Sequence, residues 1–139
     1  MRMLIPILAV LLLAACSSGP RTLSATDGAF SVPLSDLAGG KARHYSVDID
    51  GKTVRFFLVQ TPDGVTRAAF DACDVCFPEK KGYSQDGEYM ICNNCGMRFH
   101  ASRINEVSGG CNPAPLARNV VDGTVVLRAE DLRAGLRFF

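Results

Sequence analysis

The sequence contains the pair Cys73-Asp74-Val75-Cys76 and Cys92-Asn93-Asn94-Cys95, with 15 residues between the two motifs, and Gly96 directly after the second. Two residues between paired cysteines allow a tight turn that presents both sulfurs to one centre. Two such turns can supply the four thiolates of a tetrahedral metal site. A glycine after the turn suits a backbone position with positive φ. The spacing therefore predicts two knuckles of the zinc-ribbon or rubredoxin type, with Cys73, Cys76, Cys92 and Cys95 as metal ligands.

The spacing leaves other uses of these cysteines open. Cysteines of exported proteins usually oxidise, so a disulfide framework is one alternative. If Cys16 is lipidated, however, five of the six cysteines remain and at least one of them would be unpaired. A redox-active Cys-x-x-Cys of the thioredoxin type is a second, although that motif normally opens a helix after a strand. A zinc ion that only staples the fold is a third.

Further candidate ligands lie close to the two motifs. Cys111 stands in Gly109-Gly110-Cys111-Asn112-Pro113, where the glycines and the proline indicate a loop of fixed and unusual shape. It could replace one of the four ligands or complete a second site. His100 follows the second motif and is a possible imidazole ligand. Met90 and Met97 flank that motif, and because thioethers favour copper(I), copper is a further candidate metal.

The N-terminus has the composition of an export signal. Arg2 supplies a positive end, and an apolar stretch over residues 4–13 is too short to span a bilayer as a mature helix. Leu13-Ala14-Ala15-Cys16 resembles the bacterial lipobox, which implies that Cys16 becomes a lipidated N-terminus. We expect a signal peptide over residues 1–15, a lipidated N-terminus and tether over 16–27, and a domain over 28–139. The protein would then be anchored in the bacterial cell envelope and face the periplasm or the exterior.

Composition and charge exclude several classes of function. The formal net charge is +1 and the basic residues form no stripe, so nucleic acid is not an expected partner. No Ser/His/Asp set, phosphate-binding glycine loop or paired carboxylate stands out, so hydrolase or transferase chemistry is not predicted. The region after the tether is long enough for one domain with one core. An electron-transfer role remains compatible with the cysteines.

Turn signals predict a β-rich α+β domain built from hairpins. Alternating apolar residues flank Asp50-Gly51, Asp86-Gly87 and Asp122-Gly123, and each of these dipeptides is typical of a hairpin turn. Thr61-Pro62-Asp63-Gly64 predicts another turn. Residues 129–134 can form one turn of helix, and no long helical period is present.

The cysteine-bearing stretches together resemble the FtrD-like family of membrane iron–sulfur proteins. The resemblance covers about residues 54–126 and is most specific in Cys73-Asp74-Val75-Cys76-Phe77-Pro78, in residues 92–99 and in residues 103–116. It implies an extracytoplasmic domain that binds an iron–sulfur cluster or mononuclear iron. The matched cysteines are Cys73, Cys76, Cys92, Cys95 and Cys111.

The resemblance also implies a functional setting. The family is associated with iron-permease systems and with electron transfer to or from iron. Many of its members carry several membrane helices, whereas here only a lipid anchor is expected, so electrons could cross the membrane only through a partner. A membrane iron permease or a redox protein is the expected partner. The spacing by itself favours a mononuclear tetrahedral ion such as zinc, so a zinc-knuckle interaction module stays an alternative, as does a copper carrier.

Overall fold

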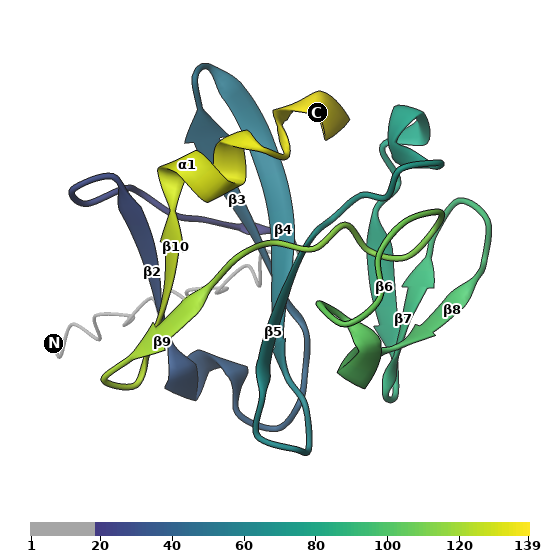
Figure 1. The fold of residues 1–139 in the computed structure, drawn as a ribbon, viewed down its shortest axis with the longest axis horizontal. Coiled ribbons are helices and arrows are strands. Elements are labelled where there is room, and N and C mark those ends of the chain that lie inside the picture. The colour runs from purple at the N-terminus through teal and green to yellow at the C-terminus, as the bar shows by residue number, and fades with distance from the viewer. Residues whose placement is uncertain (1–18) are drawn as a thin grey trace, which may run out of the picture.

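The computed structural model describes residues 19–139, and β-strands dominate it (Figure 1). The strands are β1 (Arg21–Thr22), β2 (Ala29–Pro33), β3 (Arg43–Ile49), β4 (Lys52–Gln60), β5 (Thr66–Phe70), β6 (Tyr83–Asp86), β7 (Tyr89–Cys92), β8 (Arg98–His100), β9 (Asn119–Val121) and β10 (Thr124–Arg128). Helix α1 spans Ala129–Arg133, and short 3₁₀ turns are η1 (Leu34–Leu37), η2 (Phe77–Glu79), η3 (Ala101–Arg103) and η4 (Leu136–Phe138). The prediction of a small β-rich domain with few helices is confirmed.

The strands form three sheets (Figure 1). The central sheet has the order β1-β3-β4-β5, the terminal sheet the order β2-β10-β9, and the cysteine sheet the order β6-β7-β8. All neighbouring strands are antiparallel except β1 and β3, which pair in parallel. The cysteine sheet takes its name from Cys92, the last residue of β7.

The three predicted hairpins are present. Asp50 and Gly51 both have positive φ, as do Asp122 and Gly123, and this is the backbone geometry of the tight turns that match the twist of a hairpin. The third hairpin joins β6 to β7 with Asp86 opposite Tyr89, so its turn residues are Gly87 and Glu88. The predicted turn at residues 61–64 joins β4 to β5.

Strand β4 is buried on both faces and therefore holds the domain together. Val54, Phe56 and Leu58 point into a core that also contains residues of the terminal sheet and of α1. Phe57 and Val59 point the other way, into a second core that contains residues of the cysteine sheet. Because successive side chains of a strand point to opposite faces, one strand serves both cores. The central sheet thus lies between the other two sheets, in agreement with Figure 1.

The first described residues of the chain include a strand of the central sheet. Strand β1 pairs with β3 at Arg21 and Thr22, inside the stretch predicted as a tether. The predicted signal peptide and the lipidation site Cys16 lie outside the described residues. Within residues 19–139, no helix is long and apolar enough to cross a membrane.

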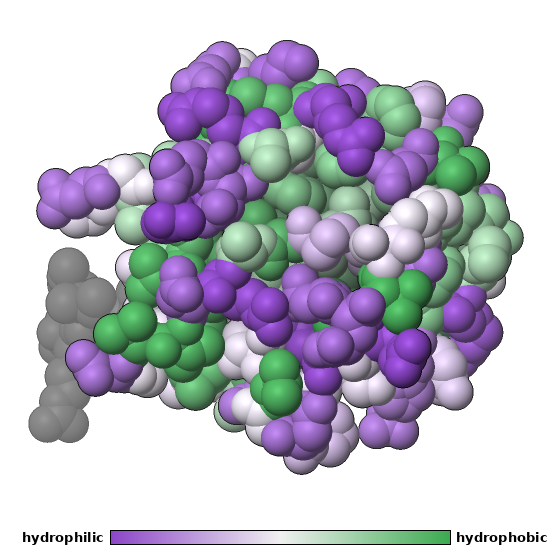
Figure 2. Space-filling model, viewed as in Figure 1, coloured by the Kyte–Doolittle hydropathy of each residue, from purple (hydrophilic) through white to green (hydrophobic). Residues whose placement is uncertain are grey.

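An apolar surface patch lies over edge strand β9. Val120 and Val121 are exposed there, and Figure 2 shows hydrophobic residues gathered over this strand at the lower left of the molecule. Elsewhere on this face polar and apolar residues are mixed. The cysteines belong to the opposite end of the domain, next to the cysteine sheet.

Candidate metal centre

Three chain segments bring five cysteines together between the central sheet and the cysteine sheet. Cys73 and Cys76 follow β5, and Cys76 is the residue directly before η2. Cys92 ends β7 and Cys95 lies in the turn after it. Cys111 comes from the loop between η3 and β9. Cys73, Cys76 and Cys92 are buried, Cys111 is half-buried and Cys95 is exposed.

The loop that carries Cys111 is tied to the edge of β5. Its Leu116 amide donates to the carbonyl of Ala68 at 3.1 Å, and Ala114 exchanges backbone hydrogen bonds with Phe70 and Ala72. The Asn105 side chain also bonds both backbone groups of Ala68, at 2.9 and 3.0 Å, as a neighbouring strand would. The loop therefore extends the sheet edge and delivers Cys111 to the first cysteine pair.

The sulfurs form two groups of three that share one member. The Sγ atoms of Cys73, Cys76 and Cys111 all lie within 4.8 Å of one another, and so do those of Cys76, Cys92 and Cys95. The Cys76 and Cys111 sulfurs are 3.8 Å apart. All five cysteines are free thiols. The two motifs therefore converge, and Cys76 is the sulfur at which they meet.

The grouping differs from the single four-sulfur set that the spacing predicts. A tetrahedral ion with metal–sulfur bonds of about 2.3 Å places its four sulfurs about 3.8 Å from one another. The sulfurs of Cys73, Cys76, Cys92 and Cys95 do not form one group within 4.8 Å; Cys73 groups with Cys111 instead. Cys111 is thus as much a member of the cluster as the four motif cysteines.

Hydrogen bonds lower the pKa of two of the thiols, whereas burial raises the pKa of two others. Burial opposes ionisation of Cys73, but hydrogen bonds from the Cys76 amide, the Tyr83 side chain and the Val75 amide together outweigh it and lower the pKa of this thiol. A backbone hydrogen bond from Met97 lowers the pKa of Cys95. Burial raises the pKa of Cys92 to about 11 and, aided by the neighbouring Cys95 and Cys76 sulfurs, that of Cys111 to about 12.

The close spacing of the thiols and the amides around them indicate which kind of ligand the cluster suits. Amides that point at sulfur stabilise thiolate and are a usual part of thiolate metal sites. Several thiolates cannot share one small volume without a cation between them, because like charges disfavour further ionisation. Amides directed at sulfur and closely spaced thiols are features of a site that can bind a cation.

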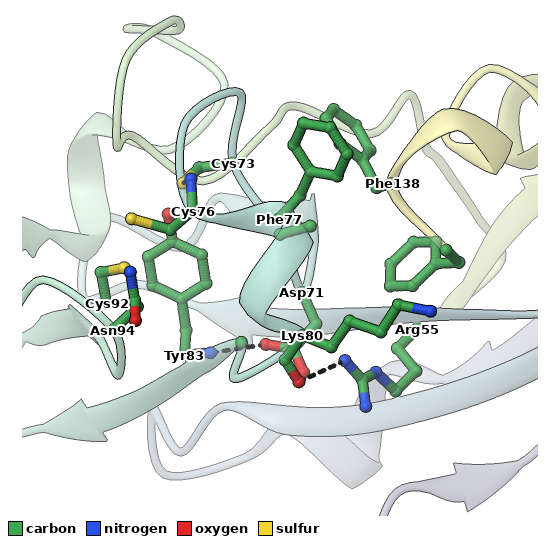
Figure 3. Close-up of a pocket in the computed structure, with 13 residues that line it drawn as sticks. Arg55, Asp71, Cys73, Cys76, Phe77, Lys80, Tyr83, Cys92, Asn94 and Phe138 are labelled. Carbon is green, nitrogen blue, oxygen red and sulfur yellow. Dashed lines mark hydrogen bonds between the residues drawn. The ribbon is translucent and has the colours of Figure 1, made fainter.

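Gly96 and Tyr83 shape the site from two sides. Gly96 has φ +75°, and its amide donates to the Cys92 carbonyl at 2.8 Å, which closes the turn as predicted from its position. The Tyr83 hydroxyl donates to the Cys111 carbonyl at 2.6 Å. At the other end of Tyr83, its amide donates to the buried carboxylate of Asp71 at 2.7 Å. Figure 3 shows the Tyr83 ring rising from Asp71 toward Cys73 and Cys76.

A small cavity adjoins the sulfurs. Its volume is about 10 Å³, close to that of one water, and its lining includes Cys73, Cys76, Cys92 and Tyr83 (Figure 3). Arg55 and Lys80 also line it. The site thus has room for a single small ligand beside the cysteines.

The remaining candidate ligands differ in their surroundings. His100 belongs to neither group of three; its Nδ1 contacts the Ser102 hydroxyl at 2.8 Å, and its Nε2 lies 3.8 Å from Glu88. Met90 is fully buried in the second core, whereas Met97 is exposed. The described residues therefore bring together the five cysteines and no histidine.

Sequence reasoning missed Tyr83 and Asn105 as parts of the site. Tyr83 stands directly opposite Cys92 in the β6–β7 pairing, so the hairpin itself carries a signal for its position. Asn105 has φ +70°, which is uncommon for a side-chain-bearing residue, and its side chain replaces a strand partner. Nothing in the local sequence indicates that second role.

Comparison with known proteins identifies the chain as a member of a metalloprotein family. A family model described as "Membrane iron-sulfur containing protein FtrD-like" matches residues 37–139, which include both cysteine motifs and Cys111. The chain belongs to the FtrD-like family. No match was found among curated proteins or among solved structures.

Proposed function

We propose that this protein is a lipid-anchored, extracytoplasmic iron-binding protein that serves iron transport or electron transfer. The observation that carries the proposal is the convergence of five free cysteine sulfurs from three chain segments. The description of the family as iron–sulfur containing supports iron over other metals. The lipobox at residues 13–16 supports the anchor and the extracytoplasmic location.

The donor set fits this assignment chemically. Both sulfur groups consist of cysteine alone, and all-thiolate sites suit iron–sulfur clusters, mononuclear iron or zinc. An iron–sulfur cluster or mononuclear iron would supply one-electron redox chemistry when bound. The chain's own residues would hold it: Cys73 and Cys95 are the thiols poised to ionise, and amides of the two turns would stabilise their charge.

The exposure of Cys95 suits exchange with a partner. Three of the five cysteines are buried, while Cys95 stands at the surface. A metal centre with one ligand at the surface can come close to a redox partner while its buried ligands remain shielded from water. The partner we propose is a membrane iron permease or an associated redox protein, because this setting is implied by the resemblance described above.

Anaerobic purification of the full chain, followed by analysis of iron, acid-labile sulfide and visible absorption, tests the proposal. Iron with sulfide indicates a cluster, and iron without sulfide indicates mononuclear iron; either result supports it. A colourless protein with stoichiometric zinc would contradict it. For the anchor, Cys16→Ser should release the protein from the membrane fraction, whereas a membrane-bound variant would refute lipidation.

A structural zinc module is the second candidate, favoured by where the cysteines attach. Cys73 and Cys76 extend from the central sheet, Cys92 and Cys95 from the cysteine sheet, and Cys111 from the loop beside β5. An ion held by two knuckles would cross-link these parts and so couple metal binding to folding. Under this alternative a chelator unfolds the domain, but the metal-loaded protein shows no redox wave in voltammetry.

A further inference from the structure

We propose that the centre holds two metal positions and that the thiolate of Cys76 is shared between them. One position is formed by Cys73, Cys76 and Cys111, the other by Cys76, Cys92 and Cys95. The proposal rests on the metal-binding function proposed above and specifies its nuclearity and its bridging ligand.

The distances between sulfurs favour two positions over one. Each group of three lies within 4.8 Å, close to the roughly 3.8 Å sulfur–sulfur separation around a tetrahedral ion. No group of four or five sulfurs meets this condition in the described residues. Two ions, one in each group, use all five cysteines with little displacement, whereas one ion would leave at least one sulfur unused.

The backbone around Cys76 holds its sulfur in the position that a ligand shared by two ions requires. Its sulfur is the one that belongs to both groups. Its amide donates to the Cys73 sulfur at 3.2 Å, and its carbonyl accepts from the Glu79 amide at 3.1 Å at the start of η2. Cys76 is therefore fixed by the turn on both of its sides, and its sulfur sits inside the cluster.

The net charge of the five thiolates and their ions also favours two ions over one. Five thiolates on one divalent ion would leave a net charge of roughly −3 in a mostly buried site, whereas two such ions reduce it to roughly −1. The only cationic side chains that line the adjacent cavity are Arg55 and Lys80. A second metal ion bound by the sulfurs neutralises their charge more directly than these two side chains.

The ligand count leaves room for one small exogenous ligand. Each ion receives three cysteine ligands, and a tetrahedral ion takes four. The cavity beside Cys73, Cys76 and Cys92 has the volume of about one water. A single sulfide, hydroxide or water there, shared by both ions, would supply the fourth ligand of each, and the acid-labile sulfide assay distinguishes sulfide from the oxygen ligands.

Titration of the reduced, metal-free full chain with cobalt(II) under anaerobic conditions tests the proposal. The sulfur-to-cobalt absorption should rise to an end point of two ions per chain. A thiolate bridge couples the spins of the two ions, so the electron paramagnetic resonance signal per cobalt should fall between the first and second equivalent. An end point of one ion, or two ions with additive signals, would overturn the proposal.

Variants identify the shared ligand. Cys111→Ser and Cys95→Ser should each lose one of the two ions, because each affects one group only. Cys76→Ser should lose tight binding at both positions, and His100→Gln, as the control, should keep both. If Cys76→Ser fails to fold, the other variants still decide: an unchanged end point in Cys111→Ser would contradict the two-position site.

The outcomes also separate this inference from the proposed function. Two zinc ions in the natively purified chain, with the same response to the variants, would leave the shared thiolate in place and refute the iron function. A single iron bound by four cysteines would keep the iron function and refute the shared thiolate.

Discussion

Removal of the Tyr83 hydroxyl should weaken the domain even when no metal is bound. Tyr83 is 4% exposed, and its ring contacts Phe57 and Phe99, with centroids 6.0 and 6.3 Å away. Tyr83→Phe keeps these ring contacts and removes the hydroxyl, which donates to the Cys111 carbonyl at 2.6 Å and also interacts with the Cys73 sulfur. A buried acceptor left without its donor costs about 1–3 kcal/mol. Because Cys111 is half-buried, water can replace part of the lost bond, and we expect a loss of about 1–2 kcal/mol.

Urea unfolding of the reduced, metal-free chain measures this loss, with the two proteins expected to show equal m-values. Tyr89→Phe is the matched control. Tyr89 is 39% exposed, and its ring would keep its contact with the Arg98 guanidinium, so its stability should change by less than about 0.5 kcal/mol. Equal stability of the two variants would refute the role given to the Tyr83 hydroxyl.

Three further predictions follow from residues around the site. Gly82→Ala should cost about 2–4 kcal/mol in urea unfolding, because a Cβ at this position with φ +63° would overlap the Asp71 carboxylate; a loss below about 0.5 kcal/mol would contradict that contact. Arg67→Met should lower the free energy of unfolding by about 2–4 kcal/mol, since this 5%-exposed side chain bonds Asp63, Glu106 and the Ile104 carbonyl. The control Arg98→Met, which removes an ion pair at a 51%-exposed arginine, should lower it by less than about 1 kcal/mol. Similar losses in the two variants would be inconsistent with this account. Burial raises the pKa of the Asp71 carboxyl above its ordinary value of 3.8. The contribution of this group to stability is therefore complete below pH 3.8 and is lost as pH rises through the raised pKa. Asp71→Asn should flatten this part of the stability–pH curve, and an unchanged slope would contradict the prediction.

The sequence was most informative where a local conformation has a strict residue requirement. The dipeptides at residues 50–51 and 122–123 place two successive residues at positive φ, and Asp-Gly accepts this geometry at little cost. These two turns were therefore found where predicted, whereas the β6–β7 turn lies one residue later than predicted, at Gly87 and Glu88. Gly96 was predicted for the same reason, because its turn also needs positive φ.

The grouping of the sulfurs could not be predicted from spacing. Spacing within a Cys-x-x-Cys motif reports on one turn, whereas the partner of Cys73 is Cys111, which is brought in by a loop paired with β5. That pairing depends on the Asn105 side chain and on residues 114–116, none of which has a strand pattern of its own. Likewise, the two cores on either face of β4 result from long-range packing that a single strand pattern does not specify.

The most direct measurement of the central claim is anomalous diffraction at the iron edge from crystals of the anaerobically purified protein. We predict two peaks, with the Cys76 sulfur within bonding distance of both and Cys73 with Cys111 on one side and Cys92 with Cys95 on the other. One peak bound by the four motif cysteines, or disulfide bonds in place of any peak, would contradict the account.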